Sequence, residues 1–295
     1  MLEKIKNKII TWPKKNGTTL WKALLLEHRL PFRYKEGVFN IFALLSCQFH
    51  RRYHSYKKII EVNLTNKCNL SCINCGSSCR YAPSDEYMSL EQIKKFIDES
   101  LRLRWGWEKI KLYGGEPTLH PNFSDVLSLI KRYKKFHPLC RICLITNGVG
   151  KYVKESLSKV PNWVEIHCST KEGMESKFEL FESYNLAPID LKKYKNADFS
   201  KGCWRIEKCG MCISPSGYYV CAPGYHIDRV FGFDVGLKRM EEINDVNFKK
   251  QLTVLCKYCG FYKEPKELVS KEVMSITWKG AYKKYKNKKP KLLDY

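Results

Sequence analysis

Apolar and polar positions alternate regularly from residue 58 onward. Four short segments are apolar and rich in β-branched residues, which predicts strands: 58–64, 109–113, 141–146 and 163–169. Three segments between them carry apolar residues at helical spacing: 90–102, 121–136 and 152–158. Strands that alternate with helices predict a parallel sheet of βα units, so the chain is expected to be of the α/β class. In such sheets the chemistry lies at the carboxyl ends of the strands.

The first helix has a clear beginning. Ser89 and Gln92 have the spacing of a capping box, and Leu90, Ile93 and Phe96 then follow on one face.

From Cys203 the composition changes, because six cysteines fall within 57 residues. Residues 212–221 predict a β-hairpin with its turn at Pro215-Ser216-Gly217. Residues 245–255 predict a helix that leads to Cys256 and Cys259. This part of the chain is therefore expected to be a small cysteine-rich α+β domain.

The composition is that of a globular protein with basic ends. The 295 residues are 44% apolar and 13% aromatic, which excludes intrinsic disorder, and the net charge is +23. Residues 1–60 hold 13 basic and 3 acidic groups, and residues 261–295 hold 10 and 4. No secretory signal is recognisable at the start, and the longest apolar stretch, 38–49, is too short to span a bilayer. A cytoplasmic protein is expected, in which 14 cysteines indicate metal rather than disulfides.

Three cysteines follow the first strand with the spacing C-x3-C-x2-C, at Cys68, Cys72 and Cys75. Three thiolates leave a tetrahedral zinc ion one ligand short, but they can hold three irons of a [4Fe–4S] cluster and leave the fourth iron open. The alternative is a zinc knuckle with Cys79 as fourth ligand.

Two further motifs end the next strands. Gly114-Gly115-Glu116-Pro117 follows the second strand, and Thr146-Asn147-Gly148 ends the third. Together with the cysteine loop they resemble the radical S-adenosylmethionine (SAM) superfamily over residues 58–200. The resemblance implies a partial (β/α)6 barrel with SAM bound to the open iron and to the Gly-Gly-Glu-Pro segment. By position, Asn147 and Ser169 line the SAM pocket; turn-forming and strand-ending roles are the alternative.

The resemblance also implies the chemistry. One electron from the reduced cluster splits SAM into methionine and a 5′-deoxyadenosyl radical, which abstracts hydrogen from an unactivated carbon. The residue before the third cysteine is usually aromatic in this family, and here it is Asn74.

The second cysteine group resembles the SPASM and shorter twitch domains of radical SAM enzymes, which hold an auxiliary [4Fe–4S] cluster. By this resemblance the ligands are Cys203, Cys221, Cys256 and Cys259, with Cys209 as the runner-up. Cys212 is expected to pack in the core. Two clusters are therefore expected, and the alternative is a structural zinc ion on four of these cysteines.

Other polar residues are weaker candidates. Glu165 and His167 alternate on the fourth strand, so they share a face and either a catalytic role or a satisfied core pair fits them. Cys140, Cys143 and Cys168 are expected to pack in the core. Four residues after Cys221 are candidates for substrate contacts or for an internal salt bridge: Tyr225, His226, Asp228 and Arg229.

The expected function is that of a radical SAM oxidoreductase of the dehydrogenase or epimerase type, acting on a polar, carbohydrate-like small molecule. A maturase of a ribosomally made peptide and a non-catalytic zinc protein that binds RNA are the alternatives. The expected partners are an anionic small molecule or glycan and a flavodoxin or ferredoxin; a membrane surface fits the basic ends, and nucleic acid is not expected. The expected domains are a basic extension (1–57), the barrel (58–200), the twitch-like domain (201–262) and a basic tail (263–295).

Overall fold

The computed structural model describes residues 52–169, 181–182, 184–262, 268–269 and 272–295. The predicted basic extension therefore lies outside the described residues, apart from 52–57. In the part that is described, no helix is both long and apolar enough to cross a membrane.

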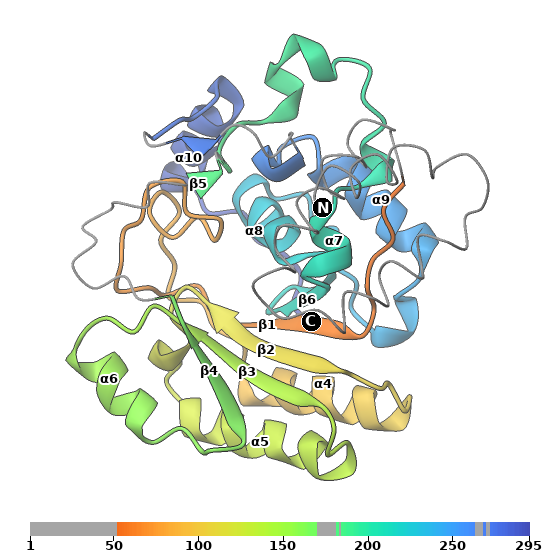
Figure 1. The fold of residues 1–295 in the computed structure, drawn as a ribbon. Helices are drawn as coiled ribbons and strands as arrows, with labels where there is room; N and C mark the ends of the chain where they lie inside the picture. Colours follow the sequence, from red (N-terminus) through yellow and green to blue (C-terminus); the bar gives the residue numbers. More distant parts are fainter. Residues whose placement is uncertain (1–51, 170–180, 183, 263–267, 270–271) are drawn as a thin grey trace, which may run out of the picture. The chain divides into compact units, whose positions relative to one another are not determined.

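A six-stranded sheet in the order β4-β3-β2-β1-β6-β7 is the centre of the fold (Figure 1). Its strands are β1 (Ile59–Thr65), β2 (Lys109–Gly114), β3 (Arg141–Thr146), β4 (Val164–Cys168), β6 (Met211–Ser214) and β7 (Gly217–Tyr219). Strands β1 to β4 and β6 run parallel, and β7 returns antiparallel to β6. The α/β class predicted from the sequence is confirmed.

One face of the sheet is apolar and is covered by helices α4 (Leu90–Arg102) and α5 (Phe123–Phe136) (Figure 1). The predicted capping box is present at Ser89 and Gln92. Alternate residues of the strands, such as Val62, Leu112 and Leu144, are fully buried against these helices. The third crossover helix is α6 (Lys151–Ser158).

The opposite side of the sheet is covered by the C-terminal half of the chain (Figure 1). Its helices are α7 (Arg205–Lys208), α8 (Ala222–Phe231), α9 (Asp245–Leu255) and α10 (Ile276–Asn287). A second, aromatic core includes Tyr184, Tyr219, Tyr225 and Trp278. A two-stranded sheet pairs β5 (Phe181–Glu182) with β8 (Leu268–Val269). Short 3-10 helices occupy Pro117–Leu119, Pro188–Asp190, Lys192–Tyr194, Phe199–Lys201, Met240–Glu242 and Gly260–Tyr262.

The predicted hairpin forms, but it does not stand apart from the sheet. Ile60, Glu61 and Val62 of β1 pair directly with β6. The sheet therefore has five parallel strands and one antiparallel strand, and the fifth parallel strand comes from the cysteine-rich segment. The proposed boundary near residue 200 falls inside one compact unit, Arg52–Tyr295.

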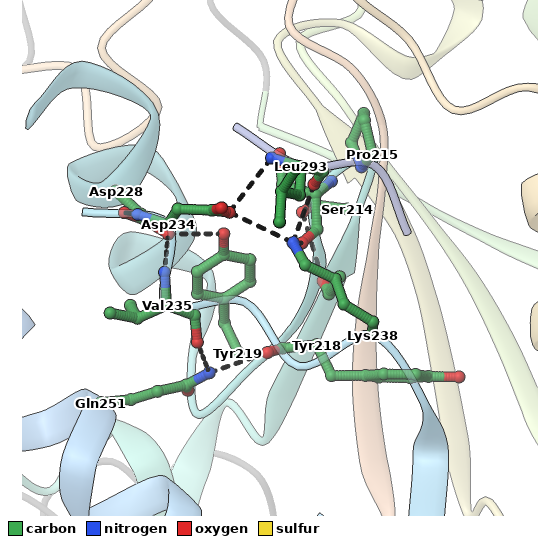
Figure 2. A network of polar contacts seen from close by, with 12 residues as sticks. Ser214, Pro215, Tyr218, Tyr219, Asp228, Asp234, Val235, Lys238, Gln251 and Leu293 are labelled. Atoms are coloured by element: carbon green, nitrogen blue, oxygen red, sulfur yellow. Dashed lines mark hydrogen bonds and ion pairs between the residues drawn. The ribbon is translucent and has the colours of Figure 1, made fainter. Parts of the chain in front are cut away.

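Polar contacts fix this hairpin to the helices that follow it (Figure 2). The buried Asp228 carboxylate accepts from the Tyr219 hydroxyl at 2.7 Å and from the Val235 N–H at 2.9 Å. Gln251 Nε2 donates to the carbonyls of Tyr218 and Val235. The hairpin, α8 and α9 thus share one hydrogen-bond network, and Cys221 and Cys256 lie at the start of α8 and the end of α9.

Candidate functional site

The first cysteine loop lies at the carboxyl end of β1. The Cys79 thiol hydrogen-bonds to Cys68 and Cys75, which lowers the pKa of Cys68 and raises that of Cys79. Cys79, which the sequence named only as a zinc alternative, therefore lies beside the predicted cluster ligands. Asn74 has a left-handed backbone (φ 49°), a conformation that asparagine tolerates better than an aromatic residue.

The cysteine loop is held from the C-terminal half of the chain. Fully buried Arg229 donates to the carbonyls of Ala82 (2.8 Å) and Ser77 (3.1 Å), and the Tyr282 hydroxyl donates to Ser78 Oγ. Helices α8 and α10 therefore position the loop.

The Gly-Gly-Glu-Pro segment passes very close to the strand next to it. A Cβ atom on Gly114 would lie 2.2 Å from the Thr65 carbonyl oxygen, and one on Gly115 would lie 2.3 Å from that of Lys67. The Gly115 N–H donates to Thr65 O and the Glu116 N–H to Lys67 O, both at 2.8 Å. Only glycine permits this approach, which brings the segment against the cysteine loop.

Glu116 is completely buried and acts as an acceptor between loops. Its Oε1 accepts from the hydroxyls of Thr118 and Thr146, both at 2.8 Å, and its Oε2 accepts from the Asn147 N–H at 2.8 Å. The side chain thus fixes the loops after β2 and β3 relative to each other.

The end of β3 reaches the cysteine loop through Asn147. Asn147 Nδ2 donates to Asn69 Oδ1 at 2.9 Å and lies 3.9 Å from Cys68 Sγ. Ser169 is exposed beyond β4, and its hydroxyl donates to the Thr146 carbonyl. All three predicted motifs are therefore assembled at one end of the sheet, with Ser169 at its edge. The roles of these residues in SAM binding stay predictions.

The four cysteines expected to hold an auxiliary cluster line one cavity: Cys203, Cys221, Cys256 and Cys259. Burial, followed by the proximity of the other thiols, raises the pKa values of Cys221 and Cys256. Cys209 and Cys212 lie outside the lining of this cavity. Cys212 packs in the aromatic core, as expected, with its sulfur 3.4 Å from the Tyr113 hydroxyl.

The inner face of the sheet, opposite α4 and α5, carries polar side chains. Strand register places five of them in one row: Cys212, Glu61, Lys111, Cys143 and Glu165. Lys111 Nζ pairs with Glu61 at 2.9 Å. Cys143 is completely buried, as the core prediction requires, and its thiol belongs to this polar row, 3.4 Å from Glu165 Oε2.

Arg141 determines the state of Glu165. Its Nε and Nη2 donate to the two carboxylate oxygens at 2.7 and 2.6 Å, and this hydrogen bonding lowers the pKa of Glu165 to about 2. Glu165 is therefore ionised at neutral pH and too weak to serve as a base there. Cys140, by contrast, packs in the apolar core as predicted, whereas Cys168 is exposed at the end of β4.

The four candidates after Cys221 make internal contacts. The Tyr225 hydroxyl accepts from Asn66 Nδ2 at 2.7 Å, and His226 Nε2 lies 3.4 Å from the Tyr113 hydroxyl. Asp228 and Arg229 belong to the networks described above. The stabilising interpretation therefore accounts for these residues, although their contacts are hydrogen bonds to loops and strands and not a single salt bridge.

A parallel sheet that brings a C-x3-C-x2-C loop against a glycine-rich segment at its carboxyl end defines an iron–sulfur protein of the α/β class. Residues 62–187 match the family model described as the radical SAM superfamily. The chain carries a radical SAM domain, and the cofactors of this family, a [4Fe–4S] cluster and SAM, are those expected at its first cysteine loop.

Curated relatives share this domain. GTP 3′,8-cyclase of Clostridium perfringens is 35% identical over 154 residues, which cover 51% of this chain and 42% of the relative. The probable GTP 3′,8-cyclase of Pyrococcus horikoshii is 29% identical over 138 residues, which cover 47% of this chain and 42% of that relative. The chain thus spans less than half the length of these relatives.

Solved structures with a similar arrangement are more distant. The structure of BtrN in complex with AdoMet and 2-DOIA has 13% identity and a TM-score of 0.41, covering 75% of this chain and all of BtrN. The structure of Streptococcus suis SuiB bound to the precursor peptide SuiA has 16% identity and a TM-score of 0.30, covering 46% of this chain and 29% of SuiB.

Proposed function

We propose that this chain is a radical SAM oxidoreductase that removes two electrons from a polar, carbohydrate-like small molecule. The observation that carries the proposal is the cavity lined by Cys203, Cys221, Cys256 and Cys259, because four thiols suit a second [4Fe–4S] cluster. When bound, SAM and the first cluster would supply a radical that takes a hydrogen atom from carbon. The second cluster would then accept the remaining electron, and the hydroxyl proton would pass to solvent.

The chain's own residues provide the binding sites for this chemistry. Cys68, Cys72 and Cys75 would hold three irons, and the backbone of Gly114 and Gly115 would face the amino group of SAM. The contacts of Glu116 support this role, because they fix the loop that follows Gly115 against the loop after β3. A rigid segment loses little entropy when it binds a ligand.

The polar inner face supports a substrate with several hydroxyl groups. Ionised Glu165 can accept a hydroxyl hydrogen bond, partly exposed Lys111 can donate one, and the exposed ring of His167 can donate or accept. Because Glu165 is already paired with Arg141, it is better suited to orienting a substrate than to removing its proton.

A nucleotide-derived substrate is the second candidate. The relatives named above are GTP 3′,8-cyclases, and the inner face carries the cations Lys109, Lys111 and Arg141. Burial and the charges of Arg141 and Lys111 lower the pKa of Lys109, which is the sign of crowded cations that an anionic ligand would relieve. The peptide-maturase alternative stays a prediction.

The test is turnover by the anaerobically reconstituted protein with SAM and a reductant. Sugars, aminocyclitols, nucleoside-diphosphate sugars and GTP are supplied in turn, and 5′-deoxyadenosine and oxidised product are measured. Cys72→Ala is expected to abolish both. Cys221→Ala is expected to keep 5′-deoxyadenosine formation but lose the oxidised product, while Cys168→Ser, which alters an exposed thiol, keeps both. Oxidised product from Cys221→Ala at the unaltered rate would contradict the proposal, and conversion of GTP alone would favour the second candidate.

A further inference from the structure

Strands β3 and β4 bring three potential metal ligands together on the inner face. Register pairs Cys143 with Glu165, and His167 lies two residues further along β4, on the same face. Cys143 Sγ is 3.4 Å from Glu165 Oε2, and His167 Nε2 is 3.5 Å from the same oxygen. All three ligand atoms lie within 4.8 Å of one another.

These separations are those of ligands around one zinc ion. With Zn–S of about 2.3 Å and Zn–O and Zn–N of about 2.0–2.2 Å, tetrahedral angles give about 3.6 Å between sulfur and oxygen. The same geometry gives about 3.4 Å between nitrogen and oxygen. The observed 3.4 and 3.5 Å lie within about 0.2 Å of these separations.

The surroundings also suit such a site. Arg141 donates two hydrogen bonds to Glu165, and ligating carboxylates are commonly fixed by such outer contacts. Cys143 is buried, whereas Glu165 is partly exposed and His167 is exposed, so a fourth position would be open toward the inner face. The nearby cations Lys109 and Arg141 oppose the charge of the ion. Burial, followed by the hydrogen bond to Glu165, raises the pKa of Cys143 to about 11, so the ion would displace the thiol proton when it binds.

We propose that Cys143, Glu165 and His167 bind one divalent ion of the zinc type. Three protein ligands leave the fourth position to water, which an oxygen atom of a substrate can replace, as in catalytic rather than structural zinc sites. The site would then orient a hydroxyl or phosphate oxygen on the inner face of the sheet. It is independent of the second iron–sulfur cluster, and the two can fail separately.

The test uses holoprotein whose iron–sulfur clusters have been reconstituted and whose loosely bound metal has been removed. Zinc is then titrated in by equilibrium dialysis and counted together with iron. One zinc per chain is expected without loss of iron. X-ray absorption at the zinc edge, which iron does not mask, is expected to give one sulfur at about 2.3 Å with nitrogen or oxygen at about 2.0–2.2 Å as the remaining neighbours.

Variants identify the ligands. Cys143→Ser and His167→Ala are each expected to weaken zinc binding at least tenfold, whereas Cys168→Ser, a thiol adjacent to His167, leaves it unchanged. A shell of three or four sulfurs, or zinc that displaces iron, would place the ion at the cluster cysteines and overturn the proposal. Failure to bind zinc overturns it as well, and iron that stays at its full count then leaves the proposed function standing.

Discussion

The backbone N–H of Asn147 donates a 2.8 Å hydrogen bond to the carboxylate of Glu116. This contact joins the loops that follow β2 and β3, and the same carboxylate accepts from Thr118 and Thr146. The second and third sequence motifs of the domain are therefore one hydrogen-bonded unit, and a single side chain connects them.

Glu116→Gln is expected to damage this unit. The amide places two N–H donors where the carboxylate accepted hydrogen bonds, so buried donors face one another. We therefore expect the free energy of unfolding to fall by about 2–4 kcal/mol. SAM affinity should fall with it. Denaturant unfolding and SAM binding measure both. The control is Glu155→Gln on α6, an exposed residue 3.9 Å from Lys151, which should change the stability by less than about 0.5 kcal/mol.

Gly115→Ala is expected to prevent the loop from closing on the cysteine loop. The added Cβ would lie 2.3 Å from the Lys67 carbonyl oxygen, which belongs to backbone and cannot turn away. The free energy of unfolding is expected to fall by about 3 kcal/mol or more. The contrast is Gly280→Ala in α10, where a Cβ meets nothing within 4 Å; it should raise stability by about 0.5–1 kcal/mol. Equal effects of the two variants on thermal unfolding would disprove this account of the loop.

Arg229→Ala is expected to loosen the first cysteine loop from a distance. The substitution removes the donors to Ala82 O and Ser77 O and leaves these carbonyls without this partner. The free energy of unfolding should therefore fall by about 3 kcal/mol. Less iron should be retained after gel filtration than in the wild type. Arg239→Ala, which removes an exposed partner of Glu242, should retain iron fully. Iron retention that is the same in both variants would show that the loop does not depend on α8.

Buried histidines predict the direction of the pH dependence. His120 accepts from the Asn122 N–H through Nδ1, so Nε2 carries the proton and donates to Met88 O; burial lowers the pKa of His120. The neutral ring contributes its full stabilisation at pH values above the pKa of histidine in the unfolded chain, about 6.5. This contribution is lost as the pH falls through the lower pKa of the folded state. The thermal midpoint should thus drop between pH 7.5 and 5.5, and the drop should be smaller in His120→Gln. An identical drop in both proteins would contradict this assignment.

Local patterns predicted much of the sheet. The strands β1 to β4 and the helices α4 and α5 follow from apolar periodicity, because each buries one face against its nearest neighbours in sequence. The pairing of β6 with β1 could not be predicted, since alternation within a hairpin does not specify which strand edge it joins.

The grouping of the cysteines could be predicted from the sequence, but the residues that hold them in place could not. Cysteine spacing and the resemblance to radical SAM proteins grouped Cys203, Cys221, Cys256 and Cys259, which the fold brings to one cavity. The contact of Arg229 with Ala82 spans 147 residues and has no local signature. Cys143 joins Glu165 and His167 only through the register of β3 and β4, although its alternation with Arg141 could have placed it on the polar face.

The most direct test of the two-cluster account is a count of iron and sulfide per chain after anaerobic reconstitution. The wild type is expected to hold about eight of each, as two [4Fe–4S] clusters require. A variant that lacks the first set of cysteines is expected to hold about four irons and four sulfides; its substitutions are Cys68→Ala, Cys72→Ala and Cys75→Ala. The same count is expected of a variant that lacks the second set, with Cys203→Ala, Cys221→Ala, Cys256→Ala and Cys259→Ala. A wild-type count of about four that only the first set of substitutions abolishes would contradict the second cluster, and with it the proposed two-electron oxidation.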